Sequence, residues 1–259
     1  MPEERNRDIR YAGGTDKGRV RQQNEDSILL CEFEHSEVTL FVVADGVGGH
    51  EGGAIASKLA VDSLKHTVSK AVLQANSGGG YAENWLSHTL QQAIEEANQT
   101  IIEQQQTRYS EMATTVVALL VRANDVVLSH LGDSRCYQFK PGEIRQLTED
   151  HTMLQKLLDA GDINQQQFDN SPMHHIISQA LGLVKQPQVV VTPLALMPEQ
   201  STVFLLCSDG LTNCISDAQI HYVLLSKTEL NDCVDELITR ANDNGGIDNI
   251  SAVIVKITP

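Results

Sequence analysis

Apolar residues along this chain group into short strand-like runs and into longer stretches with helical spacing. Val-, Ile- and Leu-rich runs predict buried strands at 27–34, 39–44, 114–121, 126–139, 202–209 and 249–257. Apolar positions repeating every three or four residues predict helices over 53–74 and 82–106, a short one ending at Gly161, and two more over 217–227 and 229–243. The glycine-rich residues 76–80 predict a flexible break between the two long helices.

The order of these elements favours an α+β fold. Only four residues, including the turn residues Ala-Asn-Asp, separate the runs 114–121 and 126–139. This is too short for a parallel crossover, so we expect an antiparallel hairpin. The helices arrive in pairs and do not alternate with strands, as they would in a doubly wound parallel sheet. We therefore expect antiparallel sheets covered by helix pairs.

The chain shows no internal repeat and no linker long enough to divide it. Residues 1–10 are expected to be a polar lead-in, residues 13–26 to be irregular and turn-rich, and residues 147–183 to form a helical, polar insert. The remainder, 11–259, is expected to be a single domain.

Composition removes several classes of function. An apolar content of 41% supports a sizeable core, and a formal net charge of −15 argues against nucleic acid or an anionic membrane as the main partner. Five scattered cysteines without a CxxC pair indicate a reducing compartment and no zinc site. A polar N-terminus and the lack of long apolar runs predict no secretory signal and no membrane span, hence a cytoplasmic protein. The net negative charge has two interpretations: it serves solubility, or it reflects a cluster of carboxylates that binds metal ions.

Several motifs for phosphate binding or nucleophilic catalysis are incomplete. The glycine-rich segment after the 39–44 strand has Glu51 where a dinucleotide fingerprint needs its third glycine. The segment around Ser134 lacks the closing glycine of a nucleophile elbow. The chain also lacks a Walker-type loop, a cysteine followed six residues later by arginine, and the second histidine of a zincin motif. NTP binding, thiolate phosphatase chemistry and zinc proteolysis are thus disfavoured.

Five aspartates remain, each beside a predicted strand and most beside a glycine: Asp26, Asp45, Asp133, Asp209 and Asp248. One such aspartate is usually a cap or a turn residue, but five gathered in one place would repel one another unless cations offset their charge. Ligation by oxygen alone favours Mg²⁺ or Mn²⁺ over zinc. Two such ions about 3.5–4 Å apart would activate a shared water for attack on a phosphate ester.

These residues lie in motifs that resemble the PPM-type (type 2C) protein phosphatases, in particular their compact bacterial branch. The motifs occur in the family's order over about residues 11–257: RVRQQNEDS, VVADGVGGHEGGAIAS, ATTVVALLV, HLGDSRCY, LTEDHT, LCSDGL and GGIDNISAVIV. The resemblance implies a central β-sandwich of two antiparallel sheets flanked by pairs of antiparallel helices, in α-β-β-α layers. It also implies that about 152–178 is a flap beside the active site.

The resemblance further implies a role for each matching residue. Asp45 would bridge two Mn²⁺ or Mg²⁺ ions, the Gly46 carbonyl would hold one of them, and Asp209 and Asp248 would ligate the other. Asp26, with Glu25, would bind water on the ions, and Asp133 with Asp209 would suit a third ion. Arg21 would grip the substrate phosphate with its guanidinium fork, the alternative being a solvated surface arginine.

The chain departs from the family pattern at several positions. Val47 stands where eukaryotic members often carry a histidine proposed as general acid, so the leaving group must be protonated by water or by another residue. His50 is a candidate, although a histidine opening a helix is more often structural. His174 and His175 stand in the flap where relatives commonly have Arg-Asn. Such a pair could bind a metal ion, but adjacent residues rarely face the same way, so a surface loop is the simpler interpretation.

The predicted function is therefore a metal-dependent protein serine/threonine phosphatase in which a metal-bridging water attacks phosphorus directly. Its partners would be phosphoproteins modified by a eukaryotic-like Ser/Thr kinase, and the enzyme is expected to be a monomer. Two alternatives stay open: a catalytically silent scaffold that binds phosphoproteins, and a phosphatase for small phosphate esters.

Overall fold

The computed structural model describes residues 8–47, 52–108, 111–140, 142–173, 176–196 and 199–258. Its strands are β1 (Asp8–Asp16), β2 (Ser27–Glu32), β3 (Val38–Ala44), β4 (Gly46–Val47), β5 (Ala113–Thr114), β6 (Val116–Arg122), β7 (Asp125–Leu131), β8 (Arg135–Lys140), β9 (Glu143–Gln146), β10 (Val191–Leu194), β11 (Thr202–Cys207) and β12 (Ile250–Thr258). Its helices are α1 (Gly52–Gln74), the π-helical turn η1 (Ala75–Gly79), α2 (Trp85–Arg108), α3 (Met153–Asp159), α4 (Gln165–Asp169), α5 (Asp209–Thr212), α6 (Asp217–Ser226) and α7 (Leu230–Asp243).

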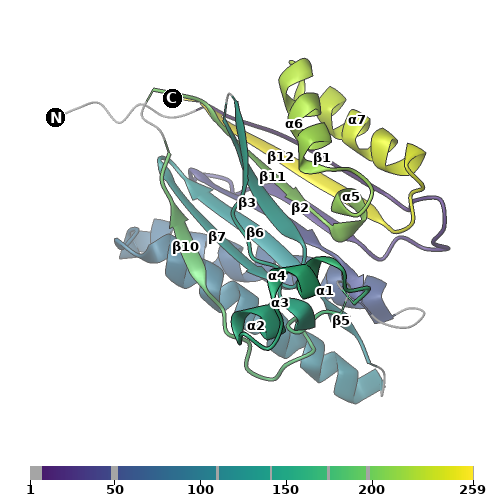
Figure 1. Ribbon diagram of the computed structural model, residues 1–259. Helices are drawn as coiled ribbons and strands as arrows, with labels where there is room; N and C mark the ends of the chain where they lie inside the picture. Colours follow the sequence, from purple (N-terminus) through teal and green to yellow (C-terminus); the bar gives the residue numbers. More distant parts are fainter. Residues whose placement is uncertain are drawn as a thin grey trace.

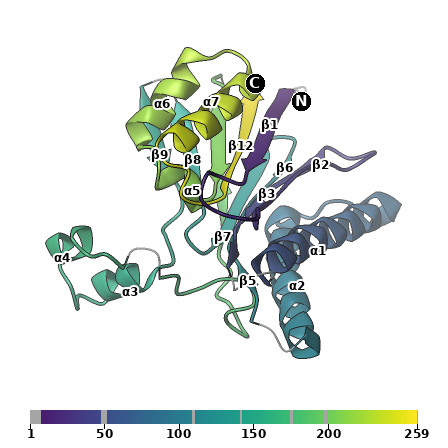
Figure 2. The ribbon, with the colours of Figure 1, turned by 90° about the vertical axis from the view of Figure 1, so that its right-hand side faces the viewer.

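Two five-stranded antiparallel sheets form the centre of the molecule, as expected. One sheet has the order β1-β12-β11-β8-β9 and the other β10-β7-β6-β3-β2, while β4 and β5 form a small separate ladder. Helices α6 and α7 cover the first sheet, and the long pair α1 and α2 covers the second (Figures 1 and 2). The layers are therefore α-β-β-α, which confirms the predicted fold class.

The Val-rich runs form strands because both of their faces are buried. In β3, Leu40 and Val42 pack toward α1 and α2, whereas Phe41 and Val43 pack between the two sheets. A strand that is apolar on both faces reads as a continuous hydrophobic run. This explains why the central strands were predictable from the sequence.

The N-terminal prediction was wrong in part. Residues 8–16 are not a lead-in and a loop but the strand β1, which pairs with β12 along its whole length. β1 is an edge strand that is largely accessible, and its two glycines give it no apolar alternation to detect. Residues 17–26 are irregular, as expected.

The predicted strand 126–139 is two strands that belong to different sheets. β7 pairs with β6 in one sheet and β8 pairs with β11 in the other, so residues 132–134 carry the chain across the sandwich. Gly132 has φ +110°, a backbone conformation that residues other than glycine rarely adopt. This conformation allows the abrupt change of chain direction. Asp133 thus lies in a crossing turn and not within a hairpin.

The helical segments differ from the predictions mainly at their ends. Most of the glycine-rich break at 76–80 is the π-helical turn η1, which continues α1 before the chain reverses into α2. The insert carries α3 and α4, which project away from the sandwich (Figure 2). We call residues 152–178 the flap.

Candidate active site

The registers of the β-sheets bring the five aspartates to one end of the sandwich. In the second sheet, Ser27 pairs with Ala44, so Asp26 and Asp45 lie side by side just beyond the paired ends of β2 and β3. In the first sheet, Cys207 pairs with Ala252 on one side and with Arg135 on the other. These two pairings place Asp209 between the loop that carries Asp248 and the turn that carries Asp133.

Asp45 lies at the electrostatic centre of the group. Its backbone N–H donates to Thr115 Oγ1 at 3.0 Å, and its carbonyl accepts from the Thr115 N–H at 2.8 Å and from Thr114 Oγ1 at 2.9 Å. Burial raises the pKa of Asp45 well above its usual value, and the negative charges of the other four aspartates raise it further. The side chains of Asp45 and Asp209 lie within hydrogen-bonding reach of each other, which two ionised carboxylates tolerate only with a shared proton or a cation.

Asp26 is fixed by serines from the first sheet. Its Oδ2 accepts hydrogen bonds from Ser208 Oγ at 2.8 Å and from Ser251 Oγ at 2.6 Å. Its Oδ1 is buried without a hydrogen-bond partner among the described residues. Burial, only partly opposed by the two serine hydroxyls, raises the pKa of Asp26 to about 6. One carboxylate oxygen is thus held in place while the other is left for a ligand.

Asp133, like Asp26, is a buried carboxylate with one oxygen that lacks a hydrogen-bond partner among the described residues. It is 7% exposed, and its Oδ1 lacks a hydrogen-bond partner in the described part of the chain. Burial, followed by the charges of Asp209 and Asp150, raises the pKa of Asp133 to about 7. A buried carboxylate with an unused oxygen normally has a cation or a polar group as its partner.

Arg21 lies at the mouth of the group and is paired with a predicted ligand. Its Nη2 donates to Asp248 Oδ2 at 2.7 Å, while Asp248 Oδ1 accepts from the backbone N–H of Asn249 at 2.8 Å. The hydrogen bond to Asp248 raises the pKa of the Arg21 guanidinium, which stays charged. The ion pair places a cationic fork beside the carboxylates, where a phosphate group would approach.

Gly46 is required where the start of α1 meets the strand ends. A Cβ atom at Gly46 would lie 2.4 Å from the backbone of Gly53 and 2.6 Å from the Glu25 carbonyl oxygen. The Gly46 N–H donates to that Glu25 oxygen at 3.2 Å. Glu25 also lies close to α1, since its Oε2 would be 2.3 Å from a Cβ atom at Gly53. The glycines thus allow close backbone packing beside Asp45.

The donor set fits a hard divalent cation. It consists of carboxylate and carbonyl oxygens, it is partly buried, and it carries several like charges. Two of its carboxylate oxygens, on Asp26 and Asp133, have no hydrogen-bond partner among the residues that the structure describes. The fit lies in the chemistry of these donors, because in the described part of the chain no three or more His, Cys, Asp or Glu side chains are arranged so that they could hold a metal ion. Both oxygens of Asp248 accept hydrogen bonds, one from Arg21 and the other from Asn249.

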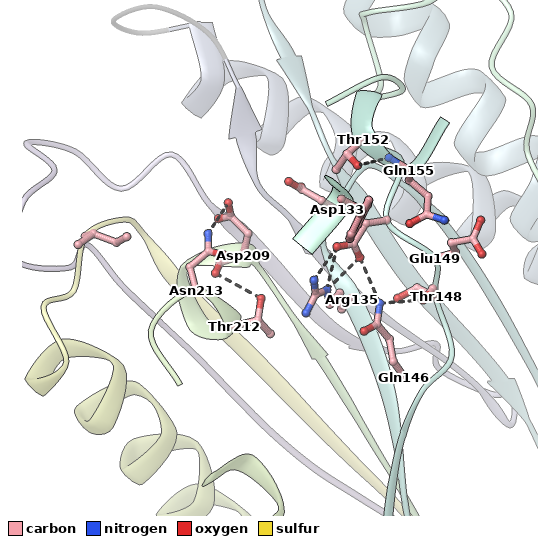
Figure 3. Close-up of a pocket in the computed structure, with 13 residues that line it drawn as sticks. Asp133, Arg135, Gln146, Thr148, Glu149, Thr152, Gln155, Asp209, Thr212 and Asn213 are labelled. Carbon is pink, nitrogen blue, oxygen red and sulfur yellow. Dashed lines mark hydrogen bonds and ion pairs between the residues drawn. The ribbon is translucent and has the colours of Figure 1, made fainter. Parts of the chain in front are cut away.

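A cavity of about 730 Å³ adjoins these carboxylates on the side of the flap. Asp209 faces it from the α5 side and Asp133 from the opposite wall, with the flap residues Thr152 and Gln155 beyond (Figure 3). On that wall Arg135 binds Asp150 through both carboxylate oxygens, with a shortest distance of 2.6 Å. The cavity offers room for a substrate chain next to the acidic group.

The model of the Protein phosphatase 2C family matches residues 13–253, nearly the whole chain. The chain belongs to the protein phosphatase 2C family. It is 37% identical to the serine/threonine phosphatase stp of Listeria innocua over 246 residues, covering 93% of each chain. It is 33% identical to the protein phosphatase PhpP of Streptococcus pneumoniae, covering 94% of this chain and 95% of that protein.

Solved structures agree with this assignment to the phosphatase 2C family. A serine/threonine phosphatase of S. agalactiae superposes with a TM-score of 0.85 at 31% identity, over 95% of this chain and 98% of that one. The catalytic domain of the phosphatase PstP, solved in complex with two manganese ions, gives a TM-score of 0.77 at 32% identity, over 97% of this chain and 99% of that one. Among the described helices, none is long and apolar enough to span a membrane.

The polar residues that hold this phosphatase 2C site together were not predicted from the sequence. Asn249 is the main one: its Oδ1 accepts from the Glu25 N–H at 2.8 Å, and its Nδ2 donates to the carbonyls of Lys17 and Gln23. It thereby ties the Arg21–Asp26 loop to Asp248. The signal was present, since Asn249 directly follows a predicted ligand, as Ser208 directly precedes another. His50, His174 and His175 lie outside the described residues.

Proposed function

We propose that this chain, a metal-dependent protein serine/threonine phosphatase, hydrolyses phosphoserine and phosphothreonine by direct attack of water on phosphorus. The observation that carries the proposal is the convergence of four aspartates around Asp45, with Arg21 beside them. Mn²⁺ or Mg²⁺ bound there would lower the pKa of a coordinated water and neutralise charge on the phosphate.

Different residues of the chain would bind the metal ions, the water and the substrate phosphate. Asp45, Asp209, Asp248 and the Gly46 carbonyl would hold two ions. The related PstP structure, which is in complex with two manganese ions, supports this number. Asp26 and Glu25 would hold water on those ions, and Asp133 would hold a third ion. Arg21 would bind two phosphate oxygens through its planar fork and so orient phosphorus toward the carboxylates.

Nearby thiols are unsuited to act as nucleophiles instead. Cys136 and Cys207, which flank the site on β8 and β11, are fully buried. Burial raises the pKa of Cys207 to about 12, and it raises the pKa of Cys136 as well, so both thiols remain protonated at neutral pH. This supports hydrolysis without a cysteinyl-phosphate intermediate. Val47 has no proton to give, so the leaving group would take its proton from water or another residue.

The partners that we propose are phosphoproteins and the eukaryotic-like Ser/Thr kinase that modifies them. The two bacterial relatives named above carry the names of serine/threonine or protein phosphatases, which supports this substrate class. We further propose that residues 11–259 act as one catalytic unit, as a monomer in the cytoplasm.

Hydrolysis of a phosphoserine peptide and of p-nitrophenyl phosphate tests the proposal. We expect Mn²⁺-dependent turnover of both by the wild type, with loss of turnover in EDTA and in Asp209→Asn. Turnover that survives both changes would refute the metal mechanism. Tight binding of the phosphopeptide without hydrolysis would favour a scaffold, and a strong preference for the small ester would favour a small-molecule phosphatase.

A further inference from the structure

His151, in the LTEDHT motif, binds both polar groups of one backbone residue in the turn that carries Asp133. The His151 N–H donates to the Gly132 carbonyl at 2.9 Å, and the His151 ring Nδ1 accepts from the Gly132 N–H at 3.2 Å. No role for this histidine follows from the proposed chemistry. Its contacts nevertheless fix the residue immediately before a carboxylate of the site.

The turn itself leaves little room for movement. A Cβ atom at Gly132 would lie 2.6 Å from Thr115, and Thr115 Oγ1 lies 2.7 Å from Ser134 Oγ in a buried hydrogen bond. Thr115 also binds the backbone of Asp45. A displacement of Gly132 would therefore be transmitted to Asp133, whose Oδ1 lacks a partner in the described part of the chain.

A second histidine supports the ring of His151. The rings of His130 and His151 are stacked with centroids 4.5 Å apart and planes 14° apart. His130 Nε2 lies 2.8 Å from the Glu149 carbonyl oxygen and so acts as the donor. Because His151 Nδ1 accepts a hydrogen bond, its ring is the neutral tautomer protonated at Nε2. Burial lowers the pKa of His151 to about 4, consistent with a neutral ring.

The same residue joins the two ends of the flap. The His151 carbonyl accepts from the Ser178 N–H at 2.7 Å, and the next residue, Thr152, forms an isolated β-bridge with Ile177. Thr152 Oγ1 then caps α3 by accepting from the Gln155 N–H at 3.1 Å. The flap therefore begins immediately after His151, the residue that holds the Asp133 turn.

We propose that His151 is a positioning residue that couples the flap to the placement of the Asp133 carboxylate. The proposal rests on the proposed function in one respect, the assignment of Asp133 to a third metal ion. A flap that shifts at Ser178 would move His151, and through Gly132 it would loosen or tighten this third site. Loss of the Nδ1 acceptor would leave a buried N–H unpaired and free the turn.

An asparagine and glutamine pair tests this assignment. The side-chain oxygen of Asn replaces Nδ1 of histidine, whereas that of Gln replaces Nε2, so only His151→Asn keeps the acceptor for Gly132. Mn²⁺ binding is followed by isothermal titration calorimetry on the full chain. We expect His151→Gln to weaken the weakest Mn²⁺ binding step by about 10- to 100-fold, as loss of outer partners of metal ligands commonly does. The two tighter steps should remain, and His151→Asn should stay close to the wild type.

Two comparisons separate positioning from general damage. His88→Gln, at an exposed position of α2, should leave all binding steps unchanged, and Asp133→Asn should abolish the same weak step that His151→Gln impairs. Equal weak-site binding by His151→Gln and the wild type would overturn the inference, as would a wild type that binds only two ions. The proposed function would stand in either case if the wild type hydrolyses phosphopeptide with Mn²⁺.

Amide hydrogen exchange in the wild type supplies a second test that needs no variant. The Gly132 and Ser178 N–H groups should gain protection together when Mn²⁺ is raised through the weak step. Protection that rises at Gly132 alone, or at neither, would overturn the coupling.

Discussion

Replacing Asp133 by asparagine should make the metal-free protein more stable at neutral pH, although it impairs the site. The carboxyl of Asp133 is 7% exposed and faces the charges of Asp209 and Asp150. Asparagine keeps its shape and removes the charge. Burial of an uncompensated negative charge is the cost that this substitution removes.

The magnitude follows from the pKa of Asp133. That pKa is raised from 3.8 to about 7, and each pKa unit corresponds to about 1.4 kcal/mol, so ionised Asp133 destabilises the fold by about 4 kcal/mol above neutral pH. An amide that stays partly unpaired costs about 1–3 kcal/mol. The net gain in the free energy of unfolding should then be about 1–3 kcal/mol.

The sign of the pH dependence is fixed by the raised pKa. The folded wild type holds the Asp133 proton more tightly than the unfolded chain, so stability present at pH 4 is lost as the pH rises through about 7. Urea denaturation in EDTA at pH 5.5 and pH 8 measures this. The advantage of Asp133→Asn should be large at pH 8 and should shrink at pH 5.5. If Asp133→Asn is less stable than the wild type at pH 8, or if its gain in the free energy of unfolding does not depend on pH, then the buried charge of Asp133 does not destabilise the fold.

Two further substitutions probe the geometry of the site. Arg21→Lys replaces a planar fork by a point charge and should raise KM for a phosphopeptide about tenfold with a smaller change in kcat; unchanged steady-state constants would rule out phosphate binding by Arg21. Gly210→Ala would place a Cβ atom 2.0 Å from the Asn249 carbonyl oxygen, so it should cost about 1–3 kcal/mol in urea denaturation and lower kcat by displacing α5. Gly161→Ala is the control for Gly210→Ala, since Gly161 has φ +76° and a Cβ atom there meets nothing within 4 Å. This variant should lose about 1–2 kcal/mol in the free energy of unfolding but keep its activity. Equal activity of the Gly210→Ala and Gly161→Ala variants would contradict a role for the position of α5 in catalysis.

The central strands and the acidic residues could be predicted from the sequence for a physical reason. Strands such as β3 are buried on both faces and so give long apolar runs, and the runs of β3 and β11 lead into an aspartate. Asp45 and Asp209 stand at such ends. The pattern of an apolar run followed by an aspartate therefore predicted the strand ends at which the site lies.

What the sequence did not predict depends on tertiary contacts. β1 is stabilised by pairing with β12 and not by its own apolar content, and the change of sheet at Gly132 is set by packing against Thr115. Asn249 and Ser251 likewise acquire their roles only when β12 brings them to the Arg21–Asp26 loop. Polar residues that hydrogen-bond to other polar residues across the fold produce no periodic pattern of apolar positions in the sequence.

Mn²⁺-dependent hydrolysis of a phosphoserine peptide by Asp45→Asn tests whether turnover requires the carboxylate of Asp45. Asp62→Asn is the matched control, because Asp62 lies on the surface of α1 and pairs only with Lys58 among the interactions of its side chain that the structure describes. The account predicts that Asp45→Asn falls to the turnover of the wild type in EDTA, whereas Asp62→Asn retains full activity. Wild-type turnover by Asp45→Asn at saturating Mn²⁺ would contradict the account.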